Sequence, residues 1–100
     1  MNPAQLAKLI DVSGDTLRRW SKEYAEFLSP SATPPKGQPR EMTVHDQRVL
    51  LLISTLRTSG QDKAAIFDRL KHEQSRDWSG LPQIPGEWTA PNVRADLAAS

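Results

Sequence analysis

Cysteine is absent from this chain of 100 residues, which excludes disulfides, thiolate zinc sites, iron–sulfur clusters and thiol nucleophiles together. The two histidines, His45 and His72, are isolated and cannot form a metal site on their own. No apolar run approaches the roughly 18 to 20 residues that a transmembrane helix needs, and the N-terminus lacks a signal-peptide pattern. The sequence thus predicts no cofactor, no metal ion, no membrane partner and a cytoplasmic location.

The length is that of one small domain, and 37% hydrophobic with 25% charged residues is typical of a soluble globular protein. A domain of this size buries about a dozen large apolar side chains, which leaves little room for a cofactor cavity. The spacing of the carboxylates singles out no acid–base pair, and Lys36-Gly37 lacks the rest of a phosphate-binding loop. We therefore expect the protein not to be an enzyme.

The net charge of +1 conceals an uneven distribution of charge along the chain. Residues 1–40 sum to +2, whereas residues 77–100 sum to −2. Residues 18–40 carry five basic side chains and two acidic ones. This local basic density favours a polyanionic partner, which the total alone does not suggest.

Helical periodicity is present in the first quarter of the chain. Apolar residues recur at helical spacing over residues 3–12, and a second helix begins near Gly14 after Ser13, which can cap it. The apolar side of this second helix extends from Leu17 to Leu28, opposite a mainly basic face. Two short amphipathic helices are therefore predicted here.

Two more helices are predicted in the second half. Thr43 begins the third, with Asp46 as its capping-box partner, and Gly60 ends it. Asp62 caps the fourth. Between the helix pairs, residues 29–39 contain four of the eight prolines and one glycine, which excludes a helix and predicts a loop or a small β-hairpin.

The chain beyond residue 76 loses its helical periodicity. We predict a domain over residues 1–76 and an irregular, proline- and glycine-containing tail or linker over residues 77–100. Trp78 and Trp88 lie in this tail, where packing back onto the domain and docking a partner are equally open. Segments beyond residue 76 are also the place where a homodimer or a cooperative oligomer would form.

Residues 6–20 have the spacing of a helix-turn-helix. Two short helices that cross steeply at a tight turn need a small residue for close approach and large apolar residues around it. Asp11 occupies the turn position where glycine is usual because φ is positive, at a cost on the order of 1 kcal/mol. The small residue is Ala7, and the large ones are Leu6, Ile10, Val12, Leu17 and Trp20.

On these residues the chain resembles the MerR-like winged helix-turn-helix family from residue 6 to about residue 70. The family pattern L-A followed by V-S-x-x-T-[LI]-R-x-[WY] is present as Leu6-Ala7 and residues 12–20. At the end of the wing, the family's aromatic-Arg-x-aromatic motif corresponds to residues 39–42, where Arg40 is kept and both aromatics are missing. The Arg18-Arg19-Trp20 sequence looks more like the RacA chromosome-anchoring branch than like metal-sensing members.

The resemblance implies a mainly α, winged helix-turn-helix fold that binds double-stranded DNA. Its role would be transcription regulation or the organisation and segregation of DNA, associated with the nucleoid. The long dimerising helix and the ligand sensor of typical family regulators are not visible, so no small-molecule effector is expected.

The same resemblance places the second helix in the major groove. Arg18 would read guanine through its planar donor fork, and Thr16 would donate to a phosphate or touch a thymine methyl. Arg19 and Lys22 would bind phosphates.

The wing would carry the remaining contacts, with Lys36 and Arg40 on the adjacent minor groove or its phosphates. Five cationic contacts imply a slope of log K against log salt of roughly −3 to −4.5, so one copy should bind weakly. The alternative is a protein-interaction adaptor that keeps the fold without binding DNA, favoured by Asp15 and Glu26 on the outer face and by the tail tryptophans.

Overall fold

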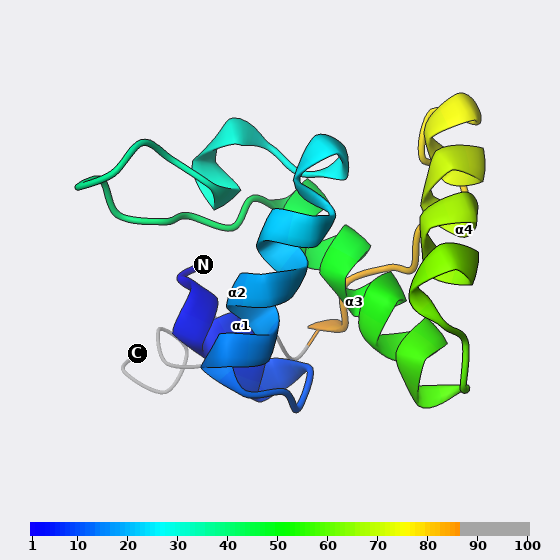
Figure 1. The fold of residues 1–100 in the computed structure, drawn as a ribbon, viewed down its shortest axis with the longest axis horizontal. Helices are drawn as coiled ribbons and strands as arrows, with labels where there is room; N and C mark the ends of the chain where they lie inside the picture. The colour runs from blue at the N-terminus through cyan, green and yellow to red at the C-terminus, as the bar shows by residue number, and fades with distance from the viewer. Residues whose placement is uncertain (87–100) are drawn as a thin grey trace, which may run out of the picture.

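The computed structural model describes residues 1–86 and has a mainly helical fold, as predicted. Figure 1 shows α3 in the centre, with α1 and α2 on one side and α4 on the other. Two single-turn 3-10 helices separate α2 from α3, and residues 1–86 contain no strand. The elements are α1 (Pro3–Leu9), α2 (Gly14–Glu23), η1 (Ala25–Phe27), η2 (Pro30–Ala32), α3 (Val44–Thr58) and α4 (Lys63–Ser75).

The predicted caps begin three of the four helices. The Ser13 side chain accepts a hydrogen bond from the backbone amide three residues on, and the Asp62 side chain does the same at the start of α4. Thr43 and Asp46 form the predicted capping box at the start of α3. These side chains satisfy amides that have no partner inside the helix, which explains why each helix begins where it does.

The turn between α1 and α2 has the conformation that a helix-turn-helix requires. Asp11 adopts a φ of 60°, and the Val12 amide donates to the Ala7 carbonyl oxygen at 2.9 Å. The left-handed residue reverses the chain, so the buried sides of α1 and α2 meet over Leu6 and Leu17, both 0% exposed. The prediction for Asp11 is therefore confirmed.

Two predictions for residues 23–32 are wrong in detail. The second helix ends at Glu23 rather than continuing to Leu28, because Tyr24 leaves helical geometry with a φ of −111° and a ψ of 24°. Residues 25–27 then form η1, which still brings Phe27 into the core and leaves Leu28 half-buried against it. Residues 29–39 also contain a helical turn, η2, which begins at Pro30, where the missing amide costs nothing.

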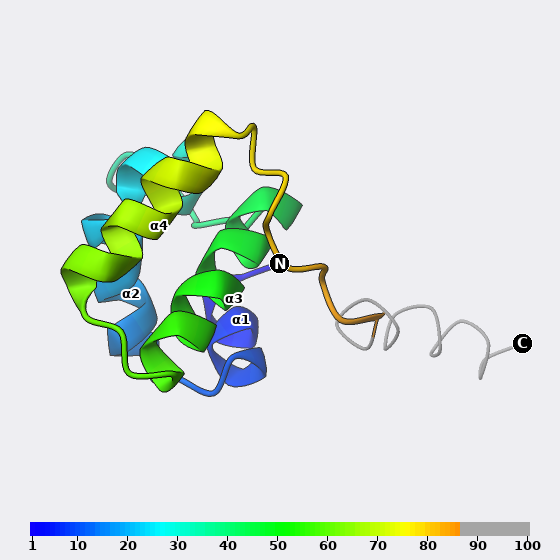
Figure 2. The same ribbon diagram turned by 90° about the vertical axis from the view of Figure 1, so that its right-hand side faces the viewer.

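The residues after α4 fold back onto the domain. Leu81 is buried in the core, and the Trp78 ring makes edge contacts with the rings of Phe27 and His45, with centroids 6.1 and 4.9 Å apart. Arg48 on α3 donates through Nε to the Pro82 carbonyl oxygen at 3.0 Å and through Nη2 to the Leu81 carbonyl oxygen at 3.1 Å. Figure 2 shows this segment returning along α3. Of the two tail tryptophans, Trp78 packs on the domain, and Trp88 lies outside the described residues.

None of the helices within residues 1–86 is both long enough and apolar enough to cross a membrane.

Candidate nucleic-acid interface

The outer face of α2 presents two basic side chains one turn apart. Arg18 and Lys22 are four residues apart, so they lie on the same side of the helix. Both are exposed, whereas Leu17 and Trp20 are buried against the rest of the domain. Burial of the apolar side therefore fixes the direction in which the basic side faces.

Residues 33–40, which we call the basic loop, extend beside α2. The loop reverses direction at a turn in which the Gln38 amide donates to the Pro35 carbonyl oxygen at 3.2 Å and Gly37 adopts a φ of 92°. The residues that flank the loop are joined, because the Glu41 amide donates to the Ser31 carbonyl oxygen at 2.9 Å. The Ser31 hydroxyl returns a bond to the Glu41 carbonyl oxygen at 3.0 Å.

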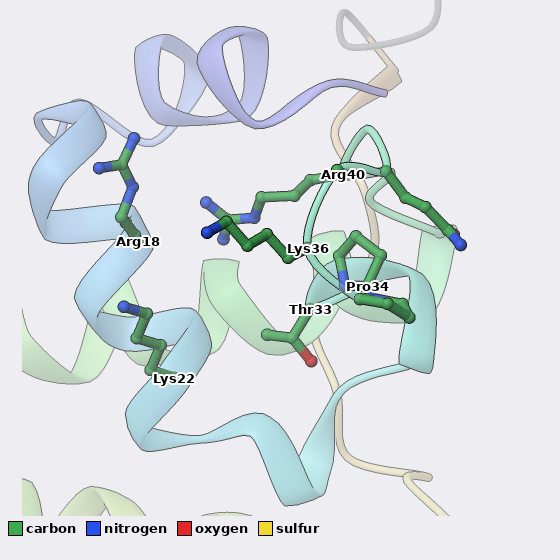
Figure 3. Close-up of a pocket in the computed structure, with 9 residues that line it drawn as sticks. Arg18, Lys22, Thr33, Pro34, Lys36 and Arg40 are labelled. Atoms are coloured by element: carbon green, nitrogen blue, oxygen red, sulfur yellow. The ribbon is translucent and has the colours of Figure 1, made fainter.

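A groove of about 260 Å³ lies between α2 and the basic loop. Figure 3 shows Lys36 and Arg40 reaching from the loop towards α2, where Arg18 and Lys22 extend along the helix. The nine residues that line the groove include these four cations and no carboxylate. The other five are Thr33, Pro34, Pro35, Gly37 and Gln38.

The Arg40 side chain is fixed by a hydrogen bond to the backbone. Its Nε donates to the Ala32 carbonyl oxygen at 3.0 Å, which anchors the guanidinium across the base of the loop. Burial, and secondly the positive charge of Arg18, lower the pKa of Arg40 below its ordinary value. The guanidinium remains charged at any ordinary pH, so the two cations repel each other in the free protein. An anion placed in the groove would relieve that repulsion.

The structure brings together four of the six predicted DNA contacts. Arg18, Lys22, Lys36 and Arg40 share the groove, whereas Thr16 and Arg19 do not line it. The Thr16 hydroxyl oxygen accepts a bond from Ser13 Oγ at 2.9 Å, so it takes part in the cap of α2. Arg19 is exposed on the neighbouring side of the helix.

Sequence reasoning missed Thr33 and Gln38, which also line the groove. Their closeness to Lys36 and Arg40 in the chain was the available indication, but proline-rich segments have no periodicity that shows which side chains face inward.

The predicted wing is a loop and not a hairpin in the part of the chain that the structure describes. Prolines at positions 34, 35 and 39 carry no backbone amide, so they cannot donate to the ladder of a hairpin. Instead, the turn at Gly37, the Ser31–Glu41 bonds and the Arg40 anchor determine the path of the chain.

Comparison with known proteins identifies the family. The family model described as MerR HTH family regulatory protein matches residues 1–73, which include all four helices up to the last turn of α4. Searches of curated proteins and of solved structures found no match. Helix-turn-helix regulators of this family bind DNA. The chain belongs to the MerR helix-turn-helix family of regulatory proteins.

Proposed function

We propose that the protein binds double-stranded DNA with α2 in the major groove and the basic loop on the adjacent minor groove or backbone. The family supports a role in transcription regulation. The organisation or segregation of DNA is the second form of the same proposal, and it rests on the RacA-like Arg18-Arg19-Trp20 sequence.

One observation carries this proposal: four cationic side chains from two separate segments meet in one groove that no carboxylate lines. Placing like charges together costs free energy, and a polyanion removes that cost when it binds. The groove also lies directly beside the exposed face of the helix that the family fold uses for recognition.

The residues divide into base-reading and backbone-binding roles. Arg18 is the candidate for guanine, because its fork can donate to O6 and N7 together, and Thr16 lies two residues closer to the start of α2. Arg19 and Lys22 bind phosphates, and Lys36 and Arg40 hold the neighbouring backbone or minor groove.

A single domain offers few contacts, so we propose that affinity comes from a homodimer or from cooperative binding through segments beyond residue 76. Five cations give a slope of log K against log salt of roughly −3 to −4.5 for one copy. When two copies are linked, binding of the first raises the effective concentration of the second at the DNA, so the overall affinity rises without any new contact.

A salt titration of binding to mixed-sequence duplex DNA tests the proposal. Fluorescence anisotropy would compare wild type with Arg18→Ala and Lys22→Ala, each of which should make the slope shallower by about 0.9. Lys71→Ala is the matched control, because Lys71 is an exposed cation on α4, outside the groove. Absence of binding at low salt, or equal effects of all three substitutions, would contradict DNA binding.

The adaptor alternative now has less support from the tail. Trp78 is half-buried between Phe27 and His45 rather than presented to a partner. Asp15 and Glu26 remain exposed, and a hollow beside Phe67 on α4 is a further candidate docking site. The adaptor reading would be supported if the wild type bound a protein partner and not DNA, and if Phe67→Ala weakened binding to that partner.

A further inference from the structure

The basic loop lacks the strands that usually hold a wing, so other contacts must fix its position. The segment that carries the basic loop begins at Ser29, before η2, and ends at Thr43, at the start of α3. These two points meet at one buried carboxylate, that of Asp46, which is 0% exposed.

Asp46 does more than cap α3. As a cap, its Oδ2 accepts a bond from the Thr43 amide at 3.0 Å, as the sequence predicts. Its carboxylate also accepts two bonds from Ser29, which lies 17 residues earlier: the amide donates to Oδ1 at 2.7 Å and the hydroxyl donates to Oδ2. Hydrogen bonds to a buried charged acceptor are among the strongest in proteins, so Ser29 is held firmly.

From Ser29 the contacts continue to the exit of the loop. Ser29 Oγ lies 2.9 Å from Ser31 Oγ, and Ser31 exchanges two hydrogen bonds with Glu41. The entry and the exit are thus connected by one network that begins at the Asp46 carboxylate.

We propose that Asp46 is a positioning residue for DNA binding: acting through Ser29, it fixes the base of the basic loop and so holds Lys36 and Arg40 opposite Arg18. A helix cap alone needs only Thr43, and the two bonds from Ser29 are what the positioning role adds. The inference rests on the proposed DNA binding, but the position of the loop can be measured without DNA.

The direct substitution, Asp46→Ala, also removes the cap of α3 and threatens folding. Ser29→Ala is therefore the decisive variant, because it removes the hydroxyl from the network and leaves Thr43 and Asp46 intact. Ser29→Thr keeps the hydroxyl and should restore the wild-type behaviour. Ser54→Ala is the matched control, since the half-buried Ser54 hydroxyl bonds to the Ile10 carbonyl oxygen at 3.3 Å, away from the loop.

Crosslinking measures the loop position directly. The chain has no cysteine, so Lys22→Cys with Lys36→Cys introduces one thiol on each side of the groove. A short bismaleimide should join them, and Ser29→Ala should slow the reaction at least about threefold, because a loosened loop lowers the effective concentration of the thiols. Ser54→Ala and Ser29→Thr should leave the rate unchanged. The Ser29 amide still donates to Asp46 Oδ1 in Ser29→Ala, so this variant tests the hydroxyl link. An unchanged rate would overturn the proposal that this link fixes the loop, whether or not the protein binds DNA.

DNA binding supplies the second measurement. In the otherwise wild-type chain, Lys36→Ala should make the salt slope shallower by about 0.9. In a Ser29→Ala background the same substitution should change the slope by less than half as much. Arg18→Ala should change the slope by the same amount in both backgrounds. Full additivity of Ser29→Ala with Lys36→Ala would show that the serine does not act through the loop. If the wild type does not bind DNA, the proposed function fails and the crosslinking result still decides the role of Asp46.

Discussion

At the scale of single residues, the helix-turn-helix stores conformational strain at Asp11. Its φ of 60° is open to glycine at no cost and to aspartate at some cost. We predict that Asp11→Gly raises the free energy of unfolding by about 0.5–1 kcal/mol, because the relief of strain outweighs the greater freedom of glycine in the unfolded chain. Urea denaturation, with the midpoint rising at constant m, would measure the gain.

Asp11→Ala is the matched comparison for that prediction. Alanine keeps the Cβ that opposes a positive φ and lacks the polar side chain that helps aspartate adopt it. It should lower the free energy of unfolding by about 1 kcal/mol. Equal midpoints for glycine and alanine would show that the turn is not strained at this residue.

Tyr24 is the one tyrosine of the chain, and burial, reinforced by Glu23, raises its pKa while Arg57 acts in the opposite sense. The fold therefore favours the neutral phenol. This contribution to stability is complete below the unfolded pKa of about 10 and is lost as the pH rises through the folded pKa. The free energy of unfolding should fall over that range, and Tyr24→Phe should remove this part of the fall.

A spectrophotometric titration of the folded protein reports Tyr24 alone, because no other tyrosine absorbs. The midpoint should lie above that of the urea-unfolded chain. A midpoint equal to or below the unfolded value would contradict the assignment.

At the scale of elements, the helices were predictable from the sequence and the groove was predictable only in part. Ser13, Thr43 and Asp62 each cap a helix within three residues of themselves, so local sequence suffices to find them. The end of α2 was placed too late because Leu28, just after η1, packs against the core and lies at helical spacing from Tyr24. The bond from Ser29 to Asp46 joins residues 17 positions apart, and no local sequence pattern predicts it.

The turn of the basic loop offers a prediction at the same scale. Gly37 has a φ of 92°, and apart from its chain neighbours no atom lies within 4 Å of the place that an added Cβ would take. Gly37→Ala should therefore strain the backbone without a clash, at a cost of about 1 kcal/mol, and displace Lys36. DNA affinity should fall towards that of Lys36→Ala.

Gly60 provides the control, because it has a φ of 95° and equally open surroundings between α3 and α4, away from the groove. Gly60→Ala should destabilise the domain about as much as Gly37→Ala and leave the DNA affinity of the folded protein unchanged. A fluorescence-anisotropy titration well below both melting temperatures would separate the two. A similar loss of affinity in both variants would mean that stability, rather than the loop, limits binding.

At the scale of the whole molecule, the net charge of +1 hides a division of surfaces. The basic groove lies beside α2, whereas α4 lies on the other side of α3 (Figure 1). On α4, Glu73 is buried beside Arg69 and Arg76, at 3.6 and 3.9 Å. These arginines are held near a carboxylate, whereas no carboxylate lines the groove. Total charge therefore predicts little about the partner, and the position of each charge on the fold predicts more.

The extent of the folding unit is the remaining property of the whole molecule, and the boundary at residue 76 stays a prediction. Leu81 is buried among the core residues, and Arg48 bonds to two carbonyl oxygens of the returning segment. Asp77 and Trp78 adopt φ values of 56° and 62° to turn the chain back. Packing of Trp78 and Leu81 must offset that strain, since neither residue is glycine.

We therefore predict that a fragment of residues 1–76 has a much lower melting temperature than a fragment of residues 1–86. Loss of a buried leucine costs about 2–5 kcal/mol, which lowers the melting temperature of a domain this small by at least about 10 °C. Leu81→Ala within residues 1–86 should reproduce most of the difference, and Gln83→Ala, an exposed position in the same segment, should not. Calorimetry of the four proteins measures this directly. Equal melting temperatures for the two fragments would place the boundary at residue 76 after all, because the returning segment would then contribute nothing to the core.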